Sequence, residues 1–127
     1  MSGDPTRKRG GERAPPGATL AVYGPTGKQV VELPEAGEVV VGRAEPATVV
    51  VDDPSLSRQH ARFFREGGGV FVEDLGSTNG TFVRGARVTR APLLDGYEAR
   101  LGDVLVVVSD GRSAGDGGEG LVSYGEL

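Results

Sequence analysis

The chain contains no cysteine and only one histidine among its 127 residues. Without cysteine there is no disulfide, no thiolate nucleophile and no iron–sulfur cluster, and a single histidine leaves few ways to build a zinc site. We therefore expect neither a metal nor a cofactor. The absence of cysteine, of a second histidine and of any recognisable cofactor loop also disfavours an enzyme.

Long hydrophobic runs are lacking as well. No apolar stretch approaches the ~18 residues of a membrane span, and residues 1–18, MSGDPTRKRGGERAPPGA, contain no hydrophobic segment of the kind that a secretory signal needs. These absences predict a cytoplasmic protein without membrane contact. The net charge of −4 argues against general nucleic-acid binding, because phosphate backbones select positive surfaces.

Both ends of the chain are rich in glycine, proline and polar residues. Residues 1–19 carry four basic and two acidic side chains, whereas residues 110–127 carry one basic and four acidic side chains. Neither end has much apolar surface to bury, so we predict a basic tail at 1–19 and an acidic, glycine-rich tail at 110–127, both flexible. The basic cluster could contact nucleic acid or acidic lipid, although a solvated tail is the simpler interpretation.

Residues 20–109 alternate short runs rich in valine and phenylalanine with Gly-Pro, Gly-Gly-Gly, Asn-Gly and Asp-Gly turn signals. In YEARLG (97–102), for example, Tyr97, Ala99 and Leu101 share one face and charged residues the other, which is typical of a half-buried strand. No window shows helical periodicity. Many short strands at this spacing predict one all-β domain, a sandwich or a barrel. The expected strands are 20–23, 29–33, 38–42, 48–51, 61–65, 70–75, 81–83, 97–102 and 103–108.

The stretch SRQH raises the question of a hydrolytic site, since Ser57 and His60 are two members of a triad. A triad needs the imidazole within hydrogen-bond reach of the hydroxyl, and a spacing of three residues in an extended or looped segment does not ensure this. A Gly-x-Ser-x-Gly elbow is also missing. We therefore interpret His60 as a buried histidine whose ring nitrogens tie a loop together.

A second fragment, GPTGKQ at 24–29, has some features of a phosphate-binding P-loop. That loop needs a glycine six residues before the lysine, where Val22 stands, and a serine or threonine directly after it, where Gln29 stands. Because both required residues are missing, the fragment is better explained as the turn of a hairpin.

Three polar segments remain, and each follows or links expected strands. They are Gly42-Arg43, Ser57-Arg58-Gln59-His60 and 76–81 (GSTNGT), and they contain hydrogen-bond donors but no carboxylate. Arginine can grip a phosphate through two parallel hydrogen bonds, and hydroxyl and backbone N–H groups add further donors. Asn79 offers both a donor and an acceptor, which suits a peptide backbone. Donors on loops at one end of a sandwich predict an anion site.

At these segments the sequence resembles the forkhead-associated (FHA) domain family. The resemblance rests on VVVGR (39–43), LSRQHA (56–61) and DLGSTNGTFVRG (74–85), in that order, and extends from about residue 20 to 108. It implies an antiparallel β-sandwich of about eleven strands that acts as a non-catalytic phosphothreonine-peptide-binding module in serine/threonine-kinase signalling. The implied partner is a phosphothreonine-containing protein, such as a kinase or its substrate. The alternative is a phospho-independent assembly module on the same sandwich.

The resemblance also implies roles for individual residues. Arg43 and Ser57 contact the phosphate, Thr78 can add a phosphate contact, and Asn79 hydrogen-bonds the backbone of the ligand. Arg58 either faces the phosphate or braces the fold.

Three further residues have structural roles in this comparison. His60 braces the binding loops, and Gly42 and Gly80 provide backbone geometry that a side chain would strain. The sequence departs from the family pattern at Arg84-Gly85, where many members have a second Asn-Gly. This departure leaves the turn type open, because arginine adopts a positive φ less readily than asparagine.

Two expectations concern selectivity and regulation. Family members often read the third residue after the phosphothreonine, and here residues 54–56 together with the 84–87 turn are expected to shape that preference. Thr6 lies in the basic N-terminal stretch. If it were phosphorylated, it could occupy the site of its own chain; the alternative is that Thr6 is never modified.

Overall fold

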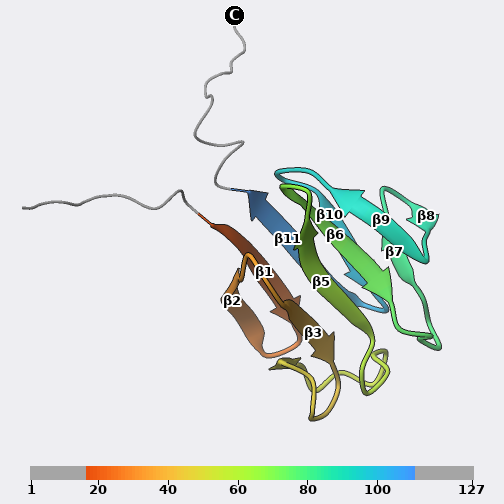
Figure 1. Ribbon diagram of the computed structural model, residues 1–127. Helices are drawn as coiled ribbons and strands as arrows, with labels where there is room; N and C mark the ends of the chain where they lie inside the picture. Colours follow the sequence, from red (N-terminus) through yellow and green to blue (C-terminus); the bar gives the residue numbers. More distant parts are fainter. Residues whose placement is uncertain (1–16, 111–127) are drawn as a thin grey trace, which may run out of the picture.

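The computed structural model describes residues 17–110, so the expected tails beyond this range and the hypothesis about Thr6 lie outside the described residues. The described part forms strands joined by turns and loops (Figure 1). The strands are β1 (Ala18–Gly24), β2 (Gly27–Leu33), β3 (Glu38–Gly42), β4 (Val49–Val50), β5 (Ala61–Glu66), β6 (Gly69–Asp74), β7 (Thr81–Val83), β8 (Ala86–Arg87), β9 (Arg90–Leu93), β10 (Glu98–Leu101) and β11 (Val104–Asp110).

The strands form two sheets that pack as a sandwich. One sheet has six strands in the order β2-β1-β11-β10-β7-β8, and the other has five in the order β4-β3-β5-β6-β9. Neighbouring strands run antiparallel except for the short parallel pair β3–β4. The predicted all-β sandwich is thereby confirmed, and the choice that the sequence left between sandwich and barrel is decided.

The core lies between the sheets and is built from alternate residues of each strand. Along β11, for example, Val104, Val106 and Val108 are fully buried, whereas the residues between them are more exposed. The five-stranded sheet contributes Phe63, the largest fully buried side chain. Burying a side chain of this kind stabilises the fold by about 1.5–3 kcal/mol, and truncating Phe63 to alanine would cost about 3–5 kcal/mol because a cavity remains.

Two strands were not expected from the sequence, and both lie at or near sheet edges. β8 is only two residues long, and β9 contains Pro92, which cannot donate a ladder hydrogen bond. Proline is tolerated because β9 pairs with β6 on one side only. The local pattern cannot reveal this, since edge position depends on the assembled sheet.

The strand boundaries also correct the expected tails at three residues. Ala18 pairs with Asp110, and Thr19 pairs with Ser109, in the β1–β11 ladder. Ala18 and Asp110 are buried. The paired core therefore runs from Ala18 to Asp110 rather than from 20 to 109. Within this range no helix is long and apolar enough to cross a membrane.

Two tight turns bear on the sequence predictions. Residues 24–27 form the expected β1–β2 hairpin, in which Gly24 pairs with Gly27. Arg84 and Gly85 connect β7 to β8 with φ angles of 53° and 84°. Positive φ at both central residues is the geometry of a type I′ turn, so Arg84 adopts it in spite of its side chain.

Candidate functional site

The three polar segments meet at one end of the sandwich. Arg43 follows β3, residues 54–58 lie between β4 and β5, and residues 78–79 lie between β6 and β7. Together they line an open pocket of about 350 Å³, and none of its lining residues is a carboxylate. All five side chains expected to bind ligand are among them: the lining is Arg43, Pro54, Ser55, Leu56, Ser57, Arg58, Thr78 and Asn79.

The His60 side chain connects two of these loops through hydrogen bonds to their backbones. Its ring is completely buried. Nδ1 accepts a hydrogen bond from the backbone N–H of Ser57 at 3.2 Å, and Nε2 donates to the carbonyl oxygen of Gly80 at 2.9 Å. Because Nδ1 is used as an acceptor, the ring carries its hydrogen on Nε2. The ring contacts the backbone of Ser57 and not its hydroxyl, so a serine–histidine proton relay is not formed.

The Ser57 hydroxyl connects the two loops on the pocket side. Its Oγ accepts a hydrogen bond from the backbone N–H of Thr78 at 3.0 Å, and Asn79 Nδ2 donates to the carbonyl oxygen of Ser55 at 2.8 Å. The hydroxyl hydrogen of Ser57 is still available to an anion. Asn79 likewise retains its side-chain oxygen and a second N–H hydrogen. The bonds that order the pocket therefore leave its donors available.

Gly42 determines how closely β3 approaches the 57–60 segment. A Cβ atom on Gly42 would lie 1.9 Å from the carbonyl oxygen of Arg58. The close approach allows two backbone bonds, from the N–H of Arg43 to the oxygen of Ser57 at 3.0 Å and from the N–H of Ala44 to the oxygen of Arg58 at 3.3 Å. These bonds hold Arg43 and Arg58 at the same pocket.

Asp74 orders the 76–81 loop, and the sequence analysis missed this role. Its carboxylate accepts hydrogen bonds from the backbone N–H groups of Gly76 and Ser77, each at 3.0 Å, and from the hydroxyls of Ser77 at 2.5 Å and Thr81 at 2.7 Å. Burial raises the pKa of Asp74, but the hydrogen bonds from Ser77 and Thr81 together lower it by more, so the pKa lies below its usual value. An aspartate with glycine two residues and serine three residues after it has the residue types of a turn, and this pattern could have indicated the role.

A second acidic residue orders the 53–57 loop. Asp53 Oδ1 accepts hydrogen bonds from the Ser55 hydroxyl at 2.6 Å and the Ser55 backbone N–H at 2.8 Å, which lower the pKa of the carboxyl. The Ser55 hydroxyl also accepts the backbone N–H of Asp103 at 2.8 Å. The loop is thus attached to the β10–β11 turn, where Gly102 leaves room for it: a Cβ there would be 2.6 Å from the carbonyl oxygen of Ser55.

The arginines of the pocket differ from Arg62 and Arg90 on the five-stranded sheet. Arg62 is paired with Glu38 and Glu73, and Arg90 with Glu66. Within the described residues 17–110, the guanidinium groups of Arg43 and Arg58 make no hydrogen bond or ion pair. Two exposed cations without a counter-charge, beside a free hydroxyl, are suited to a doubly charged anion such as phosphate.

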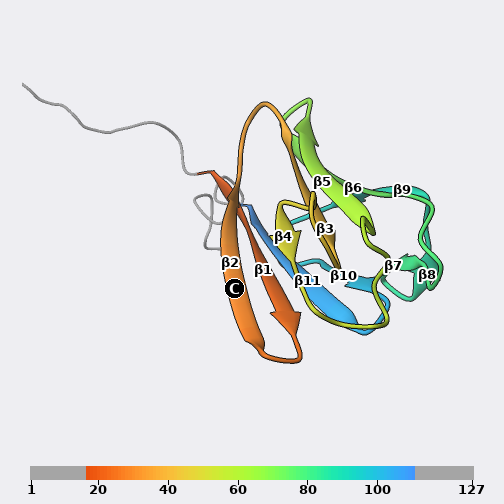
Figure 2. The same cartoon turned by 90° about the horizontal axis from the view of Figure 1, so that it is seen from below.

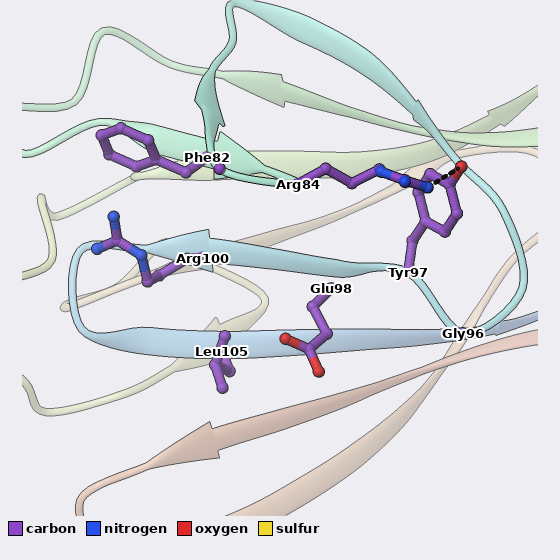
Figure 3. A pocket seen from close by; sticks show the side chains of 8 residues that line it. Phe82, Arg84, Gly96, Tyr97, Glu98, Arg100 and Leu105 are labelled. Carbon is purple, nitrogen blue, oxygen red and sulfur yellow. Dashed lines mark hydrogen bonds between the residues drawn. The ribbon is translucent and has the colours of Figure 1, made fainter.

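A second pocket, of about 380 Å³, lies at the six-stranded sheet (Figure 3). It contains Arg84 of the 84–87 turn, so this turn lines a different pocket from residues 54–56. Both of its arginines are engaged within the chain. Arg84 hydrogen-bonds the Tyr97 hydroxyl at 2.9 Å and lies over its ring, and Arg100 stacks on Phe82 at 4.4 Å. The first pocket is therefore the better anion site.

A two-sheet β-sandwich with arginine and hydroxyl donors on the loops at one end has the features of an anion-binding module. The comparisons with known proteins agree with this class. The FHA domain family matches residues 39–106, more than half of the chain. The chain belongs to the FHA domain family, a family of non-catalytic phosphothreonine-binding domains.

Several mycobacterial proteins are similar in sequence. The chain is 39% identical over 112 residues to the ABC transporter ATP-binding/permease protein Rv1747 of Mycobacterium tuberculosis. The matched residues are 87% of the chain and 13% of that protein. FhaB of Mycolicibacterium smegmatis is 42% identical over 69 residues, which are 54% of the chain and 44% of FhaB. The chain therefore spans less than half of these two relatives. Glycogen accumulation regulator GarA of M. tuberculosis is 34% identical over 118 residues, 91% of the chain and 72% of GarA.

Solved structures show the same fold. A domain from a structural and functional analysis of phosphothreonine-dependent FHA domain interactions superposes with a TM-score of 0.66 at 33% identity, covering 74% of this chain and 96% of that one. The FhaA FHA domain, in complex with the intracellular domain of Rv3910, gives a TM-score of 0.64 at 34% identity, covering 72% of this chain and 98% of that one.

Proposed function

We propose that this chain binds phosphothreonine peptides of partner proteins at the pocket of Arg43, Ser57, Arg58, Thr78 and Asn79, and that it acts in cytoplasmic serine/threonine-kinase signalling. The observation that carries the proposal is the meeting of two unpaired guanidinium groups and the Ser57 hydroxyl in one pocket without a carboxylate. A phosphate group brings about −1.5 to −2 charges and three acceptor oxygens, which match this set of donors.

The hydrogen bonds within the chain indicate what each side chain would do. The Arg43 guanidinium grips two phosphate oxygens, and the Ser57 hydroxyl donates to a third while its Oγ continues to accept from Thr78. Thr78 contributes its hydroxyl, because its N–H is already used. Arg58 is exposed and adds charge to the same pocket.

Asn79 is positioned for the peptide rather than the phosphate. Its Nδ2 is bonded to Ser55, which fixes the plane of the amide beside the pocket. The side-chain oxygen and the second N–H hydrogen then pair with backbone groups of an extended ligand. Residues 54–56 line the same pocket and contact the residues that follow the phosphothreonine.

Two relatives support the proposed partner class. The solved domain that is 33% identical comes from work on phosphothreonine-dependent FHA domain interactions. The FhaA FHA domain was solved in complex with the intracellular domain of Rv3910. By analogy, we propose that the partner here is a phosphothreonine-bearing protein such as a serine/threonine kinase or its substrate.

The test is a degenerate peptide library that contains phosphothreonine, screened on the full chain, followed by calorimetry with the selected peptide. We expect the unphosphorylated peptide not to bind. We also expect phosphoserine at the same position to bind about fourfold more weakly, because a buried methyl group contributes about 0.8 kcal/mol. Equal binding of the phosphorylated and unphosphorylated peptides would instead support phospho-independent assembly.

A further inference from the structure

The sandwich has four outer strand edges in its described part, and one of them is protected neither by short length nor by proline. β4 and β8 are each two residues long, and β9 contains Pro92. Short strands and proline are the usual means by which sheets avoid pairing with other chains. β2 has seven residues and no proline, and it is the outermost strand of the six-stranded sheet (Figures 1 and 2).

The free edge of β2 has a defined set of backbone groups. In an antiparallel ladder only alternate residues exchange hydrogen bonds with the neighbouring strand. Counting from the Gly24–Gly27 pair that closes the hairpin, Gln29 and Val31 bond to β1, whereas the residues between them direct N–H and C=O groups outward. Within residues 17–110, the backbone groups of Lys28, Val30 and Glu32 have no partner beyond β1.

The side chains of these residues lie on the solvent face of the sheet. Val30 is 57% exposed, and Tyr23, whose ring lies under the Lys28 ammonium at 5.7 Å, is 43% exposed. The solvent face of the five-stranded sheet is different, because Arg90 covers the stacked rings of Phe64 and Phe71 there. Val30, on the β2 edge itself, has no such cover.

The charges on β2 are arranged symmetrically about Val30. Lys28 precedes Val30 by two residues and Glu32 follows it by two. When two copies of β2 pair antiparallel with the Val30 residues opposite each other, Lys28 of each copy faces Glu32 of the other. Opposite charges at directly opposed positions stabilise strand pairing, and like charges oppose it. The register that satisfies the outward backbone groups is therefore also the register that pairs the charges.

We propose that the chain forms a two-fold symmetric dimer in which β2 pairs antiparallel with β2 of a second copy, centred on Val30. The occupant is a second copy rather than an unrelated strand, because the Lys28–Glu32 arrangement is complementary to itself. Such a contact is isologous and closes at two subunits.

The dimer leaves both phosphate pockets intact, because no residue that lines the pocket lies on β2. The consequence for ligand binding rests on the proposed function. A dimer holds two pockets at a constant separation, so a peptide with two suitably spaced phosphothreonines binds more tightly than one with a single site. The dimer contact itself does not depend on phosphothreonine binding.

The first test is sedimentation equilibrium of the full chain over about 1 µM to about 1 mM, the range of weak specific affinities. We expect a mass that rises with concentration toward twice the 13.1 kDa of one chain. Lys28→Glu places two glutamates opposite each other and Glu32→Lys two lysines, so each variant alone should stay monomeric. Monomeric wild-type protein throughout the series would overturn the proposal.

Charge exchange provides the decisive result. A mixture of Lys28→Glu and Glu32→Lys chains restores opposite charges across the contact, and we expect it to dimerise although neither variant does alone. The double variant should also dimerise. Glu98→Lys is the matched control, since it makes the same charge change at an exposed position on β10, away from β2, and it should behave as the wild type.

Two further readouts separate this proposal from loss of folding and from the proposed function. At a concentration where the wild type is monomeric, the single variants should melt like the wild type, because association then adds no stability. They should also bind a singly phosphorylated peptide with wild-type affinity. If the single variants dimerise as the wild type does, or if their mixture stays monomeric, the β2 register is wrong. If the wild type dimerises but does not bind the phosphorylated peptide, the proposed function is wrong and the dimer proposal stands.

Discussion

The α-carbon of Gly42 lies so close to Arg58 that a Cβ atom on Gly42 would be 1.9 Å from the Arg58 carbonyl oxygen. This approach brings the end of β3 against the 57–60 segment. Hydrogen bonds from the backbone N–H groups of Arg43 and Ala44 hold the two segments together. Glycine at this position is therefore a condition for the pocket, because backbone atoms cannot move aside as a flexible side chain can.

Gly42→Ala should destabilise the domain and weaken phosphopeptide binding together. Forcing a methyl group into a packed site costs about 1–3 kcal/mol, and the displaced segment carries Ser57 and Arg58. Denaturant unfolding and calorimetry measure the two effects. Gly69→Ala is the control: its Cβ would meet Phe71 at an ordinary 3.6 Å, so it should leave both unchanged or slightly raise stability. Wild-type behaviour of Gly42→Ala would contradict the close contact.

Arg43→Ala should remove phosphopeptide binding and leave the fold intact. Truncating one partner of a hydrogen-bonded charge pair typically costs about 2–5 kcal/mol. The Arg43 guanidinium makes no bond within the described residues, and the backbone bond from Arg43 to Ser57 is kept in the variant. Arg87→Ala serves as the control, since Arg87 is also exposed but does not line the pocket. Near wild-type affinity of Arg43→Ala in calorimetry, at an unchanged melting temperature, would refute its role in phosphate binding.

His60→Ala should lower the melting temperature by more than Ser57→Ala does. Removing the ring leaves a cavity and deprives Ser57 and Gly80 of buried partners, for a combined cost of about 3 kcal/mol. Ser57→Ala loses only a hydroxyl and one bond from Thr78, so it should mainly weaken binding. The comparison is made by thermal unfolding. A His60→Ala protein that melts like the wild type but no longer binds would make His60 a ligand contact instead of a brace.

Asp74 should contribute to the acid sensitivity of the fold. Its pKa is lowered in the folded state, so the unfolded chain binds the proton more readily. The stabilisation is therefore present above the unfolded pKa, near the ordinary value of about 3.9, and is lost as the pH falls through the lower folded pKa. Asp74→Asn should be less stable than the wild type at neutral pH.

The pH profile provides the check on this assignment. We expect the difference in unfolding free energy between the wild type and Asp74→Asn to shrink as the pH falls from about 5 to about 2. Protonation then removes the charge of the wild-type carboxylate, so both side chains are neutral. Thr89→Ala is a suitable comparison because the exposed Thr89 side chain makes no bond to Asp74. A difference that stays constant over this range would mean that the charge of Asp74 is not involved.

Much of the strand pattern could be read from the sequence. The predicted strands at 38–42 and 81–83 have the observed bounds, because alternation of buried and exposed side chains is a local property of a strand. The missed strand β9 contains Pro92, and its place at an edge is a property of the sheet. Asp74 was missed for a similar reason, since its donors meet only after the loop has folded around the carboxylate.

The amino-acid sequence alone establishes the fold class, the family and the residue types of the site. It excluded cysteine chemistry, it alternated apolar and polar residues with the period of a strand, and it carried three motifs rich in donors. Each of these is written in short stretches of chain. Only the tertiary structure decided that Arg43, Ser57 and Asn79 line one pocket, that His60 bonds the backbone rather than the Ser57 hydroxyl, and that β2 is left with an open edge. These are relationships between segments far apart in the chain, and they exist only once the two sheets have packed.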